Sequence, residues 1–170
     1  WIAKFSQTIF SSSATAAGDA VAAALAEGMS ADAIGEAISL AANQLLLRDN
    51  GRPKEWTASN KPVGSVHGDS IGVHASDTVH AWRNLAAAGD RRTQVTSLIL
   101  AGYQVARDRG NRAEFLKWDP YPRADAQEKV KSVASDALMK ELDAAIRDKD
   151  QARTAALIAR IGAEKPETSA

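Results

Sequence analysis

Alanine recurs at helical spacing along most of this chain, and this pattern restricts the possible fold more than any other feature. The clearest example follows Ser30, where apolar residues stand three or four positions apart, as on one face of a helix. They are Ala33, Ile34, Ala37, Ile38, Ala41, Ala42 and Leu45. Ser30 is a suitable N-cap, and the carboxylate of Asp32 in the first turn suits the helix dipole. Because alanine lets helices approach closely, the sequence predicts an all-α fold, a compact bundle with an alanine-rich core.

Glycine and proline divide the chain into about six predicted helices, several of them paired as hairpins. Stripes at helical spacing end at Gly28, Gly89 and Gly110, with predicted helices over 73–88 and from Asp90 onwards. Two further stripes, over 130–146 and 155–161, predict a final antiparallel pair. The proline- and glycine-containing stretch 49–72 is predicted to be one long loop. We expect a single domain over residues 1–163 and a flexible tail over 164–170.

Composition excludes several classes of function. Lysine and arginine together number 21, as do aspartate and glutamate, so the formal net charge is zero and nucleic acid is not an expected partner. The chain contains no cysteine, which excludes thiol catalysis, thiol-ligated metals and cysteine-held iron–sulfur clusters. No apolar run approaches the roughly 20 residues of a membrane-spanning helix.

The N-terminal segment is strongly apolar, and it begins at Trp1 instead of a methionine. We therefore expect a processed chain or a fragment of a larger protein. The segment lacks the layout of a signal peptide, and a cytoplasmic location is favoured. Ile2, Phe5, Ile9 and Phe10 lie near one helical face, too apolar to leave in water. This face either docks on the chain's own core or forms an interface; we expect the interface, in a homo-oligomer or with a partner chain.

All three histidines of the chain lie within fourteen residues, together with two aspartates. The five residues are His67, Asp69, His74, Asp77 and His80. On the predicted helix, Asp77 stands one turn from His74 and one turn from His80. The face that carries His74 continues through Thr78, Ala81 and Leu85, so His74 is predicted to point towards the core.

Three interpretations of this cluster remain open. A divalent metal would be held by His67, Asp69 and His74, since two imidazoles and a carboxylate suit iron(II), manganese or zinc. Alternatively, the cluster performs acid–base chemistry. Its catalytic residues would be His74, Asp77 and His80, and its substrate contacts Ser70, Thr78 and Arg83. Thirdly, these side chains only satisfy backbone groups that the long loop leaves unpaired.

The segment 24–38, Ala-Leu-Ala-Glu-Gly-Met-Ser-Ala-Asp-Ala-Ile-Gly-Glu-Ala-Ile, resembles a helical hairpin of the AhpD-like, carboxymuconolactone decarboxylase superfamily. The resemblance implies an all-helical, oligomer-prone fold. Redox members of that family carry Cys-x-x-Cys-x-x-x-His upstream of the hairpin. The corresponding positions here are Ser13, Ala16 and Ala20, so the resemblance implies no peroxidase activity and transfers no active site.

These observations favour a small-molecule enzyme or ligand-binding domain whose pocket lies between the 53–72 loop and the helix of His74. The alternative is an assembly module that packs its alanine-rich helices on a partner chain. Substrate and reaction stay open at this stage.

Overall fold

The computed structural model describes residues 1–65, 70–110, 117 and 119–164. It is 75% helical, and its described residues form eight α-helices and no β-strand. The all-α prediction is therefore confirmed. The chain divides into two compact units, Trp1–Trp118 (unit 1) and Asp119–Ala170 (unit 2), where the sequence suggested one domain over 1–163. No helix among the described residues is long and apolar enough to cross a membrane.

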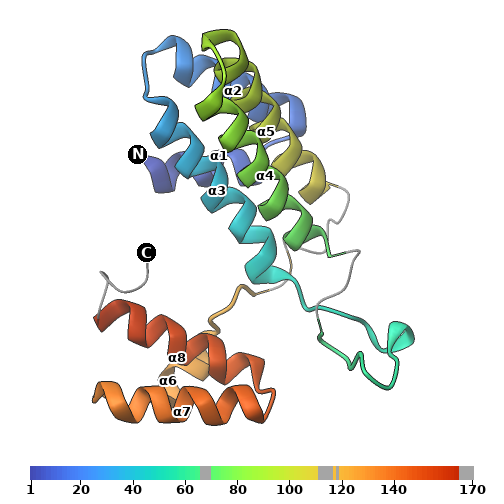
Figure 1. Cartoon of the computed structure of the whole chain (residues 1–170), viewed down its shortest axis with the longest axis vertical. Coiled ribbons are helices and arrows are strands. Elements are labelled where there is room, and N and C mark those ends of the chain that lie inside the picture. The colour runs from blue at the N-terminus through green and yellow to red at the C-terminus, as the bar shows by residue number, and fades with distance from the viewer. Residues whose placement is uncertain (66–69, 111–116, 118, 165–170) are drawn as a thin grey trace. The chain divides into compact units, whose positions relative to one another are not determined.

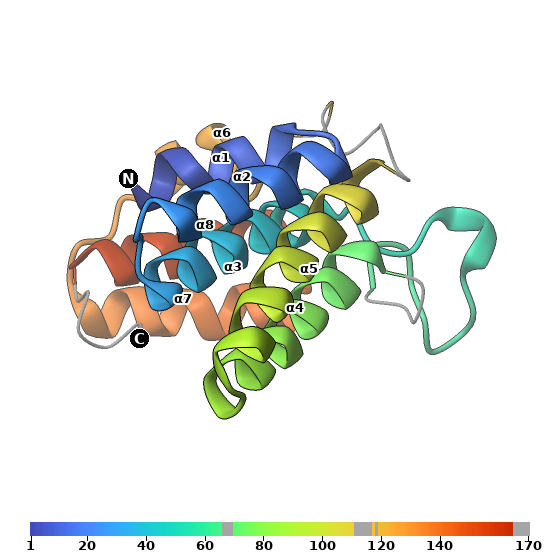
Figure 2. The ribbon, with the colours of Figure 1, turned by 90° about the horizontal axis from the view of Figure 1, so that it is seen from above.

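The described residues of unit 1 form five α-helices (Figure 1). They are α1 (Ile2–Ser11), α2 (Ala14–Ala26), α3 (Ala31–Arg48), α4 (Ile71–Ala88) and α5 (Arg91–Gly110). A short 3-10 helix, η1 (Lys54–Trp56), lies in the predicted loop. Helix α5 packs mainly against α4 and α2, and α3 packs mainly against α4 and α1. Figure 2 shows α4 and α5 side by side in the second view as well.

Local capping explains where the helices begin and end. The hydroxyls of Ser30 and Ser13 accept hydrogen bonds from the third residue of their helices at 3.1 and 3.2 Å. Asp90 Oδ1 accepts the amide of Thr93 at 2.8 Å. Gly28 has φ +84°, the left-handed conformation that commonly ends a helix. The predicted stops at Gly28 and Gly89 are confirmed, while the Ser13 cap divides the first segment into two helices. The predicted stop at Gly110 stays a prediction, since residues 111–116 lie outside the described residues.

The core of unit 1 combines isoleucine, leucine and valine with many alanines. Ile34, Ile38 and Leu45 of α3 are completely buried, as are the small residues Ala41 and Ala42 beside them. Ile9 and Phe10 of α1 belong to the same core. Much of the N-terminal apolar face thus docks on its own unit, while Trp1 stacks on Phe5 at 4.6 Å between ring centroids and stays 51% exposed. An interface through Trp1 stays a prediction.

Helices α3 and α4 touch through their backbones at Gly72. A Cβ atom added at Gly72 would lie 2.6 Å from Leu46 Cα and 2.8 Å from Leu46 N. Such distances are far inside van der Waals contact, and backbone atoms cannot rotate away as the end of a side chain can. Glycine is therefore required here by space.

The connection between α3 and α4 is fastened by hydrogen bonds at both ends. Arg52 N donates to Ser65 O at 2.8 Å, and Gly64 N donates to Arg52 O at 2.9 Å. The carboxylate of Asp49 accepts a hydrogen bond from Gly51 N at 2.8 Å and a second one from the hydroxyl of Ser70. These contacts hold the end of α3 next to the start of α4.

Unit 2 contains α6 (Ala124–Lys129), α7 (Ser135–Arg147) and α8 (Gln151–Glu164). Its fully buried cluster consists of Leu138, Ala145 and Leu157. The predicted helix over 130–146 is wrong at its start, since residues 130–134 are not helical and Val133 is 68% exposed. The apolar spacing of Val130 and Val133 suggested a helix, but Val130 packs against the buried cluster from a non-helical segment, and the helical stripe begins only at Leu138.

We predict that Gly72→Ala destabilises the protein by about 1–3 kcal/mol, because the added methyl group pushes α4 away from the α3 backbone. Gly18→Ala is the matched control, since its nearest neighbours lie at an ordinary 3.7 Å. Alanine at this mid-helix position should stabilise by roughly 0.5–1 kcal/mol. Urea unfolding followed by circular dichroism measures both changes. Equal effects of the two substitutions would contradict the close approach.

Candidate functional site

The predicted site residues on α4 lie on its solvent-facing side. His74, Asp77 and His80 are all exposed, so the prediction that His74 points towards the core is wrong. Helix α4 buries Gly72, Ala75, Val79 and Ala86 instead. These residues lie where α4 packs against α3 and α5, and the histidines occupy the other faces.

Only one residue of the predicted metal site lies among the described residues. His67 and Asp69 lie outside the described residues, and His74 is its one described member. Within the described ranges, no group of three histidine, aspartate or glutamate side chains could hold a metal ion. The metal-binding interpretation therefore stays a prediction.

Two of the predicted substrate contacts lie along α4 near its start. Ser70 is 3% exposed, accepts the amide of Val73 at 3.4 Å and donates its hydroxyl to Asp49. It therefore caps α4 and joins it to the end of α3. Thr78 is half-buried one turn beyond His74.

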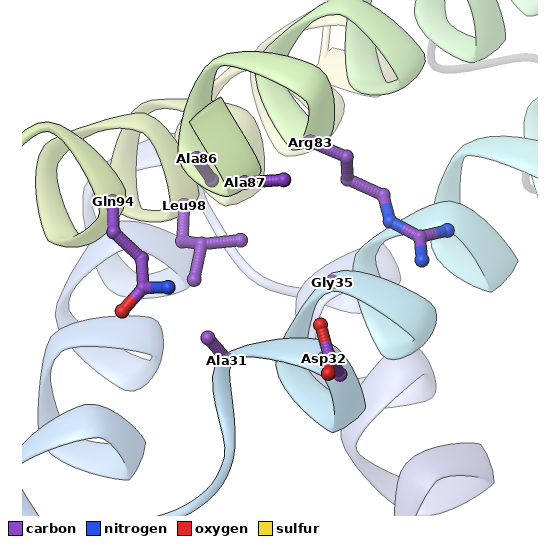
Figure 3. A pocket seen from close by; sticks show the side chains of 8 residues that line it. All are labelled: Ala31, Asp32, Gly35, Arg83, Ala86, Ala87, Gln94 and Leu98. Atoms are coloured by element: carbon purple, nitrogen blue, oxygen red, sulfur yellow. The ribbon is translucent and has the colours of Figure 1, made fainter. Parts of the chain in front are cut away.

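Arg83, the third predicted contact, lies at a different place. Its Nη1 donates to Ser39 Oγ of α3 at 3.0 Å, and Figure 3 shows its side chain extending over Gly35. It lines a cavity of about 40 Å³ together with Asp32, Gln94 and Leu98, which has room for little more than one water molecule. Arg83 follows His74 by nine residues, about 13 Å along a helix, so it does not share a site with His74.

The structure places a different charged partner near His74. Asp108 of α5 has a side chain that is only 13% exposed, 3.5 Å from Arg107. Burial raises the pKa of Asp108, while Arg107, a hydrogen bond from Gln104 and the charge of His74 each lower it. An exposed imidazole on α4 thus interacts electrostatically with a mostly buried carboxylate on α5.

A tryptophan and a glutamine support this carboxylate. The Trp82 indole Nε1 donates to Gln104 Oε1 at 3.3 Å. With its oxygen engaged by Trp82, the Gln104 amide presents its nitrogen to Asp108, with which it is hydrogen-bonded. The indole packs against the core, and it anchors this chain of hydrogen bonds. We call Trp82, Gln104, Asp108 and His74 the α4–α5 network.

Sequence reasoning missed both Asp108 and Gln104, although a signal for them exists. Helices α4 and α5 are joined by a short turn at Gly89 and Asp90. In an antiparallel hairpin, residues equally far from the turn lie side by side. Position 74 is fifteen residues before Gly89, and Asp108 is eighteen residues after Asp90. The two separations differ by less than one helical turn, so the two residues are expected at nearly the same level of the hairpin.

No protein-family model matches the chain, and neither a curated protein nor a solved structure resembles it closely enough to count as a match. The resemblance to the AhpD-like superfamily therefore stays a prediction, and the argument about function depends on this chain's own residues.

We predict that Asp108→Asn does not destabilise the protein at neutral pH. Because the folded-state pKa of Asp108 is raised, its ionised form is disfavoured in the fold, and this penalty vanishes as the pH falls through that pKa. The variant should be as stable as the wild type or slightly more stable at pH 7. The gain stays below about 1 kcal/mol because the interactions of the carboxylate with Arg107, Gln104 and His74 offset part of the cost of burial.

Urea unfolding between pH 3 and pH 8 measures this difference. The two proteins should converge at the acid end, where Asp108 is protonated and resembles asparagine. A loss of more than about 1 kcal/mol at pH 7 in the variant would instead make Asp108 a structural residue.

Proposed function

We propose that unit 1 binds a small molecule beside His74 and acts on it by acid–base chemistry. In this proposal, His74 exchanges a proton with the ligand, and Asp108 orients the imidazole and stabilises its charged form. The proposal depends chiefly on one observation: the charge of the exposed His74 imidazole acts on the mostly buried carboxylate of Asp108, which Arg107 and Gln104 also contact.

The energetics of Asp108 favour a functional role. Burial outweighs the interactions with Arg107, Gln104 and His74 that favour its ionised form, so the ionised carboxylate is disfavoured in the fold. Residues that function needs at the expense of stability are typical of active sites.

The surroundings of His74 can supply ligand contacts. Asp77 stands on the next turn of α4, and Thr78 offers a half-buried hydroxyl beside it. Bonds among Asp49, Arg52, Ser65 and Ser70 already fasten much of the described loop. This supports a role for His74 and Asp77 other than loop stabilisation. A metal ion held by His67, Asp69 and His74 is the alternative to acid–base chemistry at this place, since an imidazole nitrogen that binds a metal does not exchange a proton.

A second candidate function is assembly with a partner chain. It is favoured by exposed leucines on α3, where Leu40, Leu46 and Leu47 are 39–40% exposed. An assembly module needs such apolar surface, whereas a small-molecule site needs the α4–α5 network.

We predict that His74→Gln abolishes ligand binding without lowering the stability of the unliganded protein. Thermal unfolding of wild type would be screened against small carboxylic acids, amines, amides and phosphates, with and without Mn²⁺ or Zn²⁺. A ligand at 100 times its Kd stabilises by about 2.7 kcal/mol, which raises Tm by roughly 5–11 °C for a chain of this size.

Asn84→Ala is the control, because Asn84 is also exposed on α4 and lies almost three helical turns beyond His74. The control should retain the full shift in Tm, and His74→Gln should lose it. A ligand that stabilises both variants equally would exclude His74 from the site. Metal analysis of the purified protein tests the metal ion separately.

A further inference from the structure

The hairpin of α7 and α8 in unit 2 has two long faces of different character. The helices contact one another through Leu138, Leu142 and Ala145 on α7 and through Leu157 and Ile161 on α8. Successive residues of a helix are rotated by about 100° around its axis. In an antiparallel pair, the residues that directly precede the contact residues therefore point to one side of the hairpin, and the residues that directly follow them point to the other side. Figure 1 shows the two helices side by side.

The side that precedes the contacts is already occupied within unit 2. Helix α6 packs against α8, and Ala156, the residue before Leu157, is 1% exposed. Glu141, the residue before Leu142, hydrogen-bonds Ser132 and Arg153, the latter at 3.0 Å. The hydrogen bond from Ser132 and the charge of Arg153 lower the pKa of Glu141, so this polar side stays ionised at neutral pH.

The opposite side exposes large apolar side chains. Met139 and Ile146, each one residue after a contact on α7, are 53% and 56% exposed. Ile158, one residue after Leu157 on α8, is 55% exposed. Since all three point to the same side, they form a single apolar face, which we call the open face.

The open face has the residue spacing of a coiled-coil seam. On α7 the spacing of four, three and four is met by Ser135, Met139, Leu142 and Ile146. On α8 the same spacing is met by Gln151, Ala155, Ile158 and Gly162. None of these eight residues is charged and none is buried, so another helix pair can pack here without burying a charge.

We propose that the open face binds the open face of a second copy of the chain, forming an antiparallel four-helix bundle. The side chains of the α7 seam are larger than those of the α8 seam, and this difference favours a second copy as the partner. The α7 seam carries the large Met139 and Ile146, while the α8 seam carries the small Ala155 and Gly162. A two-fold axis parallel to the helices places each α7 over the α8 of the other copy. The large residues of each α7 seam then pack onto the small residues of the facing α8 seam.

The register of the hairpin makes this fit specific. Residues equally far from the turn at 148–150 lie at the same level, so Met139 is level with position 159 and Ile146 with position 152. The two-fold axis preserves these levels. Met139 therefore inserts between Ile158 and Gly162 of the other copy, and Ile146 inserts between Gln151 and Ala155, as knobs enter holes.

Charge and size are compatible with this pairing. Asp143 pairs with Arg147 at 3.0 Å, and Arg160 pairs with Glu164 at 3.1 Å, both within one chain. The Asp143–Arg147 pair flanks the open face and is already neutralised within one chain, whereas Arg160 and Glu164 lie on the other side of α8, away from a second copy. The fully buried cluster of unit 2 is small, and a domain of so few residues gains stability from a partner.

Sedimentation equilibrium of the full chain at 5–100 µM tests the proposal. The wild type should be a dimer, and Ile158→Glu should weaken dimerisation at least tenfold while circular dichroism stays unchanged. Ala144→Glu is the control, because Ala144 is exposed on another side of α7, and it should remain dimeric. A wild-type monomer at 100 µM, or a dimer that Ile158→Glu leaves intact, would overturn the proposal.

Cross-linking gives a second test that does not depend on how a charge affects folding. Because the chain has no cysteine, the double variant Met139→Cys, Gly162→Cys contains only the two introduced thiols. Oxidation should yield a covalent dimer in high yield, since the proposed packing brings these positions together between copies. The pair Ala144→Cys, Gly162→Cys should stay monomeric. Equal yields for both pairs would contradict the register.

Discussion

The backbone contact between α3 and α4 at Gly72 determines the arrangement of unit 1. With no Cβ at this position, Leu46 approaches to a distance that another residue would forbid. Ala41, Ala42 and Ala75, all completely buried, continue the same close packing along the two helices. Helix α4 buries Gly72, Ala75, Val79 and Ala86 in this packing and part of Trp82, and its polar side chains turn to solvent. The exposure of His74, Asp77 and His80 is thus a direct consequence of this contact.

The same close packing brings α5 alongside α4 and creates the α4–α5 network. Asp108 is buried enough for its pKa to rise, and it interacts electrostatically with an imidazole that is exposed to water. Trp82 and Gln104 hold the carboxylate from the core side. A buried acid whose ionised form is disfavoured in the fold, paired with an accessible base, is the arrangement expected of proton transfer, and it is the reason for proposing enzyme activity over assembly alone.

Unit 2 presents a different physical problem, because its few helices leave apolar surface in contact with water. One side of the α7–α8 hairpin is covered by α6 and polar groups, and the other exposes Met139, Ile146 and Ile158. A second copy would remove this surface from water at no electrostatic penalty. This proposal and the acid–base proposal concern different units and different residues. Either can therefore fail without affecting the other.

The sequence by itself determined the helical class, most of the helix boundaries and the apolar stripes, because caps, glycine stops and helical spacing act within one or two turns. Ser30, Gly28 and Asp90 needed no knowledge of the fold. Tertiary structure alone decided which face of α4 is buried. Alanine, glycine and threonine suit either a core or a surface, so the spacing around His74 was compatible with both, and the backbone contact at Gly72 selected one. Tertiary structure also gave His74 its partner on α5 and placed Arg83 at another site, since contacts between helices depend on how closely the helices pack.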